Sequence, residues 1–167
     1  EATIDGSAVP VGRCGFTGDL GYEIWMDPKD AERIWDIFME KGASYALKAA
    51  GTYALDVARI EACLLVADID YIPANKTIFE IQKSSPLELG FGWLVHLKKP
   101  YFVGQQALRE EKERGPAWLT VGLEIDLGAL EKIYADFGMP LHLPHEAWTD
   151  AVPIFREGKQ IGKATSG

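Results

Sequence analysis

The chain has 167 residues, of which 47% are hydrophobic and 25% are charged, and its formal net charge is −8 at pH 7. These proportions are typical of globular proteins and exclude a chain that is disordered throughout. The excess of acidic residues argues against a nucleic-acid or anionic-membrane partner, because binding to phosphates depends on clustered Lys and Arg.

The length allows one domain of ordinary size, or one small domain followed by part of another. Cys14 and Cys63 lie far apart and form no CxxC pair, which favours a reducing, cytoplasmic location. No apolar run approaches the roughly 20 residues of a membrane helix, and no basic-then-apolar leader opens the sequence. The sequence starts without Met just before a strand-like run and stops directly after another, so we expect a piece of a longer protein.

The first elements predicted are two short strands, at residues 8–14 (AVPVGRC) and 22–26 (YEIWM). The three glycines of the intervening GFTGDLG suit a tight connection with positive φ angles. A helix is then predicted, with Asp27 as its N-cap and Pro28 at its first position. Its apolar residues follow helical spacing, and Gly42 is expected to end it.

Two further helices are predicted between this helix and residue 115. The first covers residues 52 to about 63, with Thr52 as its N-cap, and an irregular stretch follows it. The second covers Val103–Arg114 and ends at Gly115-Pro116, a pair that terminates helices. We take this Gly-Pro pair as a domain boundary.

Beyond the boundary the pattern favours strands with one helical insertion. Residues 119–125 (LTVGLEI) alternate as in a strand, and apolar residues recur with helical period over residues 130–137. Residues 152–155 and 160–165 are predicted to pair across the turn at 156–159. The sequence therefore predicts an α+β, two-layer sheet-and-helix domain over residues 1–115, followed at 116–167 by part of a β-barrel or sandwich.

Glu23 is the most informative acid because it stands in an otherwise apolar strand directly after the glycine-rich turn. Alternation places Glu23 and Trp25 on one face of that strand, and Tyr22, Ile24 and Met26 on the other. A solvated strand face is one interpretation. The other is a carboxylate that accepts two parallel N–H donors from the edge of a pterin, and the residue type alone leaves both open.

The segment RCGFTGDLGYEI resembles the R-[TC]-G-[YF]-T-G-x-x-G-[YF]-E-I motif of the glycine cleavage T-protein (aminomethyltransferase) family. Further similarities follow in family order along essentially the whole chain. They are ALDVARIEA, DID, SPLELGFGWLVHL, FVGQQAL, VGLEID and VPIFREGKQIGKATSG.

The resemblance implies a tetrahydrofolate-dependent one-carbon transferase whose second domain is an antiparallel β-barrel. It also implies that Glu23 binds the folate ring, with Tyr22 in the same motif beside it. Trp93, at the family's G-W position, is expected to line the pocket, although a tryptophan in the core is the alternative. The family's catalytic aspartate lies upstream of the similar region, so no catalytic residue is expected in this chain.

Leu55 departs from the family, which has a folate-contacting arginine at this position, and leucine cannot make a charged hydrogen bond. Arg59, one helical turn later, could take over part of that role. Its alternative is an ion pair with Asp56 or Glu61. The departure leaves the subfamily open.

Neither the pair Asp68 and Asp70 nor the pair His142 and His145 is assigned to catalysis or metal binding. Asp68 and Asp70 match the D-I-D turn, where Asp side chains usually accept hydrogen bonds from local backbone N–H groups. His142 and His145 are three residues apart, but Pro144 disrupts helical geometry and no third ligand motif accompanies them, so no metal site is predicted.

The expected donor is a small amine-type or methylated molecule, and a lipoyl carrier protein is a candidate partner. Two alternatives remain. The first is the folate-binding domain of a demethylating or dimethylglycine- or sarcosine-oxidising protein, and the second is a folate-binding module without chemistry of its own.

Overall fold

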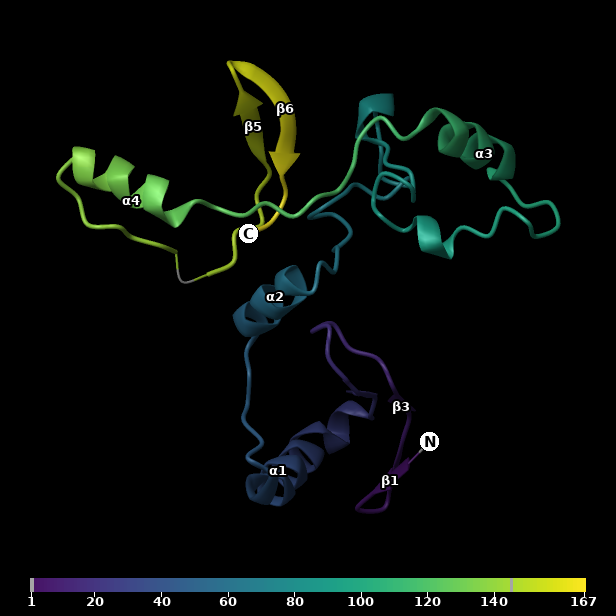
Figure 1. The fold of residues 1–167 in the computed structure, drawn as a ribbon. Coiled ribbons are helices and arrows are strands. Elements are labelled where there is room, and N and C mark those ends of the chain that lie inside the picture. The colour runs from purple at the N-terminus through teal and green to yellow at the C-terminus, as the bar shows by residue number, and fades with distance from the viewer. Residues whose placement is uncertain (1, 145) are drawn as a thin grey trace. The chain divides into compact units, whose positions relative to one another are not determined.

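The structure is a computed structural model that describes residues 2–144 and 146–167, so His145 of the predicted histidine pair lies outside the described residues. The chain forms two compact units. Unit 1 comprises Glu1–Leu65, Glu146–Thr149 and Ser166–Gly167, and unit 2 comprises Val66–His145 and Asp150–Thr165. The α-helices are α1 (Ala31–Gly42), α2 (Thr52–Glu61), α3 (Gln105–Arg114) and α4 (Leu127–Asp136). The strands are β1 (Ala2–Ile4), β2 (Ser7–Val9), β3 (Val11–Gly12), β4 (Glu23–Ile24), β5 (Val152–Arg156) and β6 (Lys159–Ala164) (Figure 1).

Unit 1 opens with a hairpin that the sequence analysis did not predict. Strands β1 and β2 pair antiparallel across a two-residue turn in which Asp5 has φ +44° and Gly6 has φ +81°. An Asp-Gly pair is a strong signal for this turn type, so the hairpin was readable from the sequence. The predicted strand at 8–14 is instead divided at Pro10, which has no N–H to donate to a ladder. Its first part pairs with β1 and its second part, β3, pairs with β4.

The start of the first helix is confirmed. A 3₁₀ turn, η1 (Pro28–Asp30), leads into α1, and the Asp27 carboxylate accepts a hydrogen bond from Lys29 N at 3.1 Å. The predicted end is also confirmed, because α1 ends at Gly42, which keeps helical angles (φ −71°, ψ −18°), and a 3₁₀ turn, η2 (Ala43–Tyr45), follows it. Ala46 has the left-handed conformation there, with φ +58°.

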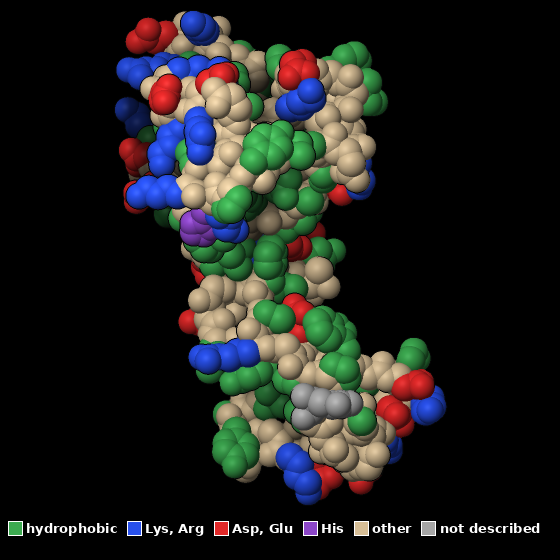
Figure 2. Space-filling view, turned by 90° about the vertical axis from the view of Figure 1, so that its right-hand side faces the viewer, with side chains coloured by type: hydrophobic (Ala, Val, Ile, Leu, Met, Phe, Trp, Pro, Cys, Tyr) green, Lys and Arg blue, Asp and Glu red, His purple; other side chains and the backbone are tan. Residues whose placement is uncertain are grey.

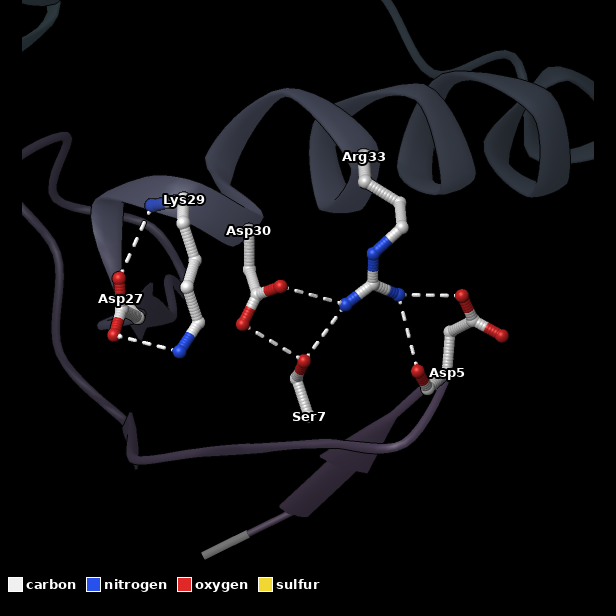
Figure 3. Close-up of polar contacts among 6 residues, drawn as sticks. All are labelled: Asp5, Ser7, Asp27, Lys29, Asp30 and Arg33. Carbon is white, nitrogen blue, oxygen red and sulfur yellow. Dashed lines mark hydrogen bonds and ion pairs between the residues drawn. The ribbon is translucent and has the colours of Figure 1, made fainter.

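A cluster of polar side chains fastens α1 to the β1–β2 hairpin (Figure 3). The Arg33 guanidinium donates to the carbonyl and the carboxylate of Asp5, to Ser7 Oγ at 2.7 Å and to the Asp30 carboxylate at 3.0 Å. Ser7 Oγ in turn donates to the other Asp30 oxygen at 2.9 Å. Hydrogen bonds from Arg33 and Ser7 hold the pKa of Asp30 below its ordinary value.

The second helix is present, but its predicted cap is wrong. Thr52 is the first helical residue of α2, and Gly51, in extended conformation, is the N-cap without a side-chain hydrogen bond. The helix ends at Glu61, and Cys63 leaves it in the left-handed conformation.

In unit 2, helix α3 ends at Gly115 as predicted, with φ +84° at that glycine. Ser85 connects the chain before α3 to the helix itself. Its hydroxyl accepts hydrogen bonds from Leu87 N and Glu88 N and donates to the buried Glu111 carboxylate at 2.5 Å. The short turns η3 (Glu80–Gln82) and η4 (Gly92–Leu94) also belong to this unit.

The predicted helix near residue 130 and the predicted hairpin are confirmed as α4 and β5–β6, whose turn is Glu157-Gly158. The predicted strand at 119–125 is wrong. Thr120 bonds to the Glu88 carbonyl through its N–H and its hydroxyl, but no ladder follows, and a strand cannot persist without a partner. The overall class, helices with small antiparallel sheets, agrees with α+β, and no closed barrel forms among the described residues.

Few apolar side chains are buried. Among the described residues, only Val9 and Ile34 are hydrophobic and fully buried. Figure 2 shows hydrophobic side chains open on the surface. Large hydrophobic residues with exposed side chains include Trp35, Tyr53, Ile81 and Trp118. None of the described helices combines the length and the hydropathy that crossing a bilayer requires.

Candidate functional site

The loop between β3 and β4, residues 13–22, carries the family-like motif and is shaped by its glycines. At its base, Gly15 and Gly21 lie so close that a Cβ placed on Gly15 would be 3.1 Å from Gly21 Cα. Further along the loop, Gly18 has φ +82°, and a Cβ placed there would be 2.6 Å from Ala62 Cβ at the end of α2. The loop therefore lies against α2 in a way that only glycine permits (Figure 1).

Strand β4 presents Glu23 on an open face. Gly12 is the register partner of Glu23. The missing side chain of Gly12 leaves room for its neighbours: a Cβ there would be 3.1 Å from Cys14 Sγ and 3.8 Å from the Trp25 indole. Hydrogen bonding to Glu23 raises the pKa of the Cys14 thiol. A carboxylate, a thiol and a flat aromatic ring thus gather around Gly12, and the predicted pairing of Glu23 with Trp25 on one face agrees with this arrangement.

Arg59 is held from several directions. It is 1% exposed, and its guanidinium donates to the Asp56 carboxylate at 3.5 Å, to the Leu64 carbonyl at 3.5 Å and to Ser166 Oγ at 3.1 Å. The predicted ion pair with Asp56 is therefore present. Burial of a charge is tolerated when such partners are supplied. These contacts give Arg59 a structural task that joins α2 to the T-S-G segment.

The D-I-D turn is likewise structural. Asp70 is buried and accepts hydrogen bonds from Val66 N at 2.8 Å and from Thr165 Oγ1 at 2.7 Å. The expectation that it satisfies a local backbone donor is confirmed. Asp68 instead forms an ion pair with Lys76, with 2.7 Å between carboxylate and ammonium.

The other predicted contacts are open to solvent. Tyr22 is 59% exposed and Trp93 is 74% exposed, so Trp93 does not lie in the core. Tyr22, Glu23 and Arg59 belong to unit 1, whereas Trp93, on η4, belongs to unit 2. Leu55 exposes 41% of its surface on α2.

Sequence reasoning missed the thiol beside Glu23. The signal was available, because two strands that pair across GFTGDLG bring the residues at the two ends of the loop together. It also missed that position 18 requires glycine, because this requirement comes from a contact with α2 and therefore from tertiary structure.

The family model described as the GCVT N-terminal domain matches residues 1–99. The chain belongs to this family. Its curated relatives include an aminomethyltransferase of Desulforamulus reducens, which is 34% identical over 98% of this chain and 38% of the relative. Another is an aminomethyltransferase of Halothermothrix orenii, 35% identical over 99% of this chain and 39% of the relative.

A relative with a different name is also similar. A trimethylamine-oxide aldolase of Ruegeria pomeroyi is 42% identical over 72% of this chain, and the matched part is 14% of that protein. The GCVT family chain thus spans about two fifths of the length of the aminomethyltransferases it matches and a much smaller part of the aldolase.

Proposed function

We propose that the protein carrying this chain transfers a one-carbon unit from an amine-type or methylated donor to tetrahydrofolate. The single observation that supports this most is the exposed Glu23 carboxylate on β4, within the region matched by the GCVT N-terminal domain. When bound, tetrahydrofolate supplies the nitrogen that accepts the one-carbon unit. The chain's own residues bind and orient it, which brings the two reactants together and lowers the entropic part of the barrier.

The residues around Gly12 fit a pterin. A carboxylate is an acceptor with two oxygens, so Glu23 can receive both parallel N–H donors of the 2-amino-4-oxo edge. Tyr22 and Trp93 are proposed as further contacts, since exposed aromatic rings can stack on a flat ligand. Arg59 remains a proposed contributor, acting from its buried position by fixing the end of α2 on which Gly18 rests.

We further propose that the chain is part of a longer protein, with a folate-binding domain over residues 1–115 and the beginning of an antiparallel barrel at 116–167. The match of the family model to residues 1–99 and the short share of the relatives' length support this division. On this proposal the catalytic aspartate lies upstream, and these 167 residues alone have no turnover. A cytoplasmic location and a lipoyl carrier as the donor's vehicle belong to the same proposal.

The test is a substitution of Glu23 in the intact protein. Glu23→Gln keeps the size of the side chain but removes its charge, and should weaken tetrahydrofolate binding by roughly 1–3 kcal/mol. Glu40→Gln is the matched control, because Glu40 is an exposed residue of α1 that forms an ion pair with its neighbour Lys41. Calorimetric titration under anaerobic conditions measures both, and equal affinities for Glu23→Gln and the unaltered protein would refute the role of Glu23.

The second candidate is a folate-binding domain in a demethylating protein. It is favoured by the 42% identity to the trimethylamine-oxide aldolase and by Leu55, which replaces a family arginine. Donor competition separates the two candidates. Consumption of an aminomethylated lipoyl carrier by the intact protein supports the first, and consumption of trimethylamine N-oxide supports the second. Folate binding with neither reaction would favour a module without chemistry.

A further inference from the structure

Cys14 lies near Glu23, the residue whose carboxylate is proposed to bind the pterin. The register of β3 and β4 pairs Gly12 with Glu23, and Cys14 follows Gly12 by two residues. Because Gly12 has no side chain, Cys14 Sγ occupies the adjacent space, 3.1 Å from where a Cβ of Gly12 would be. The thiol therefore lies beside Gly12, the register partner of Glu23, on the face of the two-stranded sheet that also carries the Glu23 side chain.

The chemistry of this pair suits a shared carboxylate. An ionised Glu accepts at about four lone-pair positions on its two oxygens. Two in-plane positions suffice for the parallel N–H donors of a pterin edge, so a third donor can bond without competing. A thiol is a weak donor that acts here only while it is protonated.

We propose that Cys14 is a positioning residue for Glu23, and that its S–H group holds the carboxylate in the orientation that receives the pterin edge. This inference rests on the proposed function, since it assigns a second residue to the same site. Trp25, 59% exposed, also borders Gly12, with its indole 3.8 Å from where a Cβ of Gly12 would be.

The electrostatics of the pair agree with this geometry. Hydrogen bonding to Glu23 and the negative charge of Glu23 raise the pKa of the Cys14 thiol. The thiol therefore stays protonated, and so remains a donor, over a wider range of pH than an isolated cysteine would.

The first experiment compares tetrahydrofolate affinities of the intact protein by calorimetry. Cys14→Ala removes the donor and should weaken binding by about three- to tenfold, which is within the range of one ordinary hydrogen bond, because a thiol is a weak donor. Cys14→Ser keeps a donor and should stay within about twofold of the unaltered protein, below the effect of one hydrogen bond. Cys63→Ala is the matched control, because Cys63 is also a free and exposed cysteine but lies at the end of α2.

The second experiment tests the contact without folate. The rate of alkylation of Cys14 by iodoacetamide is followed against pH by mass spectrometry, since only the thiolate reacts. In Glu23→Gln the pH–rate profile of Cys14 should shift to lower pH, whereas in Glu40→Gln it should not move. A purely structural cysteine would show no shift.

The outcomes separate this inference from the proposed function. If the unaltered protein does not bind tetrahydrofolate, both are overturned. The positioning role is overturned, while the folate function stands, in either of two cases. In the first, the unaltered protein binds tetrahydrofolate and Cys14→Ala binds it equally well. In the second, the pH–rate profile of Cys14 alkylation is the same in Glu23→Gln as in the unaltered protein. Weaker binding by Cys14→Ala, recovery by Cys14→Ser and a shifted profile together support it.

Discussion

Gly18 offers the sharpest test of how the motif loop is held. The residue has φ +82°, and a Cβ on it would be 2.6 Å from Ala62 Cβ. Gly6 has nearly the same φ, +81°, but nothing lies within 4 Å of its Cβ position. The two glycines therefore carry the same conformational constraint and differ in the contact, so Gly6→Ala isolates the cost of the left-handed conformation from the cost of the collision.

The expected magnitudes follow from these two terms. An alanine in the left-handed region costs about 1–2 kcal/mol, which is the expected destabilisation for Gly6→Ala. Gly18→Ala adds the displacement of Ala62, about 1–3 kcal/mol for an overpacked contact, so its total is about 2–5 kcal/mol. Ala62→Gly in the Gly18→Ala background should recover the second part, less a cost of up to about 1 kcal/mol for glycine at the end of α2.

Urea denaturation of the intact protein, followed by circular dichroism, measures the free energies of unfolding, and calorimetry gives the tetrahydrofolate affinity of the same variants. We expect Gly18→Ala to lower both quantities and Gly6→Ala to lower only stability, because the Gly6 turn lies outside the loop. Equal losses of stability for the two single variants, or no coupling between positions 18 and 62, would refute the packing of the loop against α2.

Three further predictions concern the supports of the site. Ile34→Ala should destabilise by about 2–5 kcal/mol and Ile34→Val by about 0.5–1.5 kcal/mol in urea titrations, because Ile34 is fully buried; equal small effects would contradict that burial. Asp30 has a lowered pKa, because hydrogen bonds from Arg33 and then Ser7 favour its ionised form. Its contribution to stability is therefore fully present above the ordinary pKa of about 3.9 and is lost as the pH falls from there through the lowered value. Asp30→Asn should reduce the slope of unfolding free energy against pH in that acid range, and an unchanged slope would contradict the assignment. Arg59→Lys should lower the free energy of unfolding by roughly 1–3 kcal/mol, because lysine cannot reproduce the forked contacts with Asp56 and Ser166. In a Ser166→Ala background the same substitution should cost less, because one of those contacts is already absent.

Local signals in the sequence predicted most of the elements that depend on neighbouring residues. Asp27-Pro28 starts a helix because its carboxylate reaches a nearby N–H, and Gly115 ends one because it adopts a positive φ. The β5–β6 hairpin follows from Glu157-Gly158, a two-residue turn. In each case the interacting groups lie within a few residues of one another.

Apart from the missed β1–β2 hairpin and the cap of α2, which were local, the failures involve residues far apart in the sequence. Residues 119–125 alternate like a strand, but the hydrogen bonds of Thr120 to the Glu88 carbonyl do not continue into a ladder, and alternation alone does not supply a pairing partner. The i, i+3 pair of Arg59 with Asp56 was predictable, whereas its hydrogen bond to Ser166 joins residues 107 positions apart. The positions of Cys14 and Trp25 around Gly12 also depend on how β3 and β4 pair, although the motif identified Glu23 itself.

These observations indicate what fixes the geometry of the proposed pterin site. Buried apolar side chains contribute little near Glu23, since Val9 and Ile34 are the fully buried hydrophobic residues among those described. Backbone pairing of Gly12 with Glu23 and the close contact of Gly15 with Gly21 determine the loop instead. Because a glycine contact tolerates no added methyl group whereas an exposed side chain can be shortened freely, the motif is expected to be far more sensitive to small additions at its glycines than to truncations of the exposed residues between them.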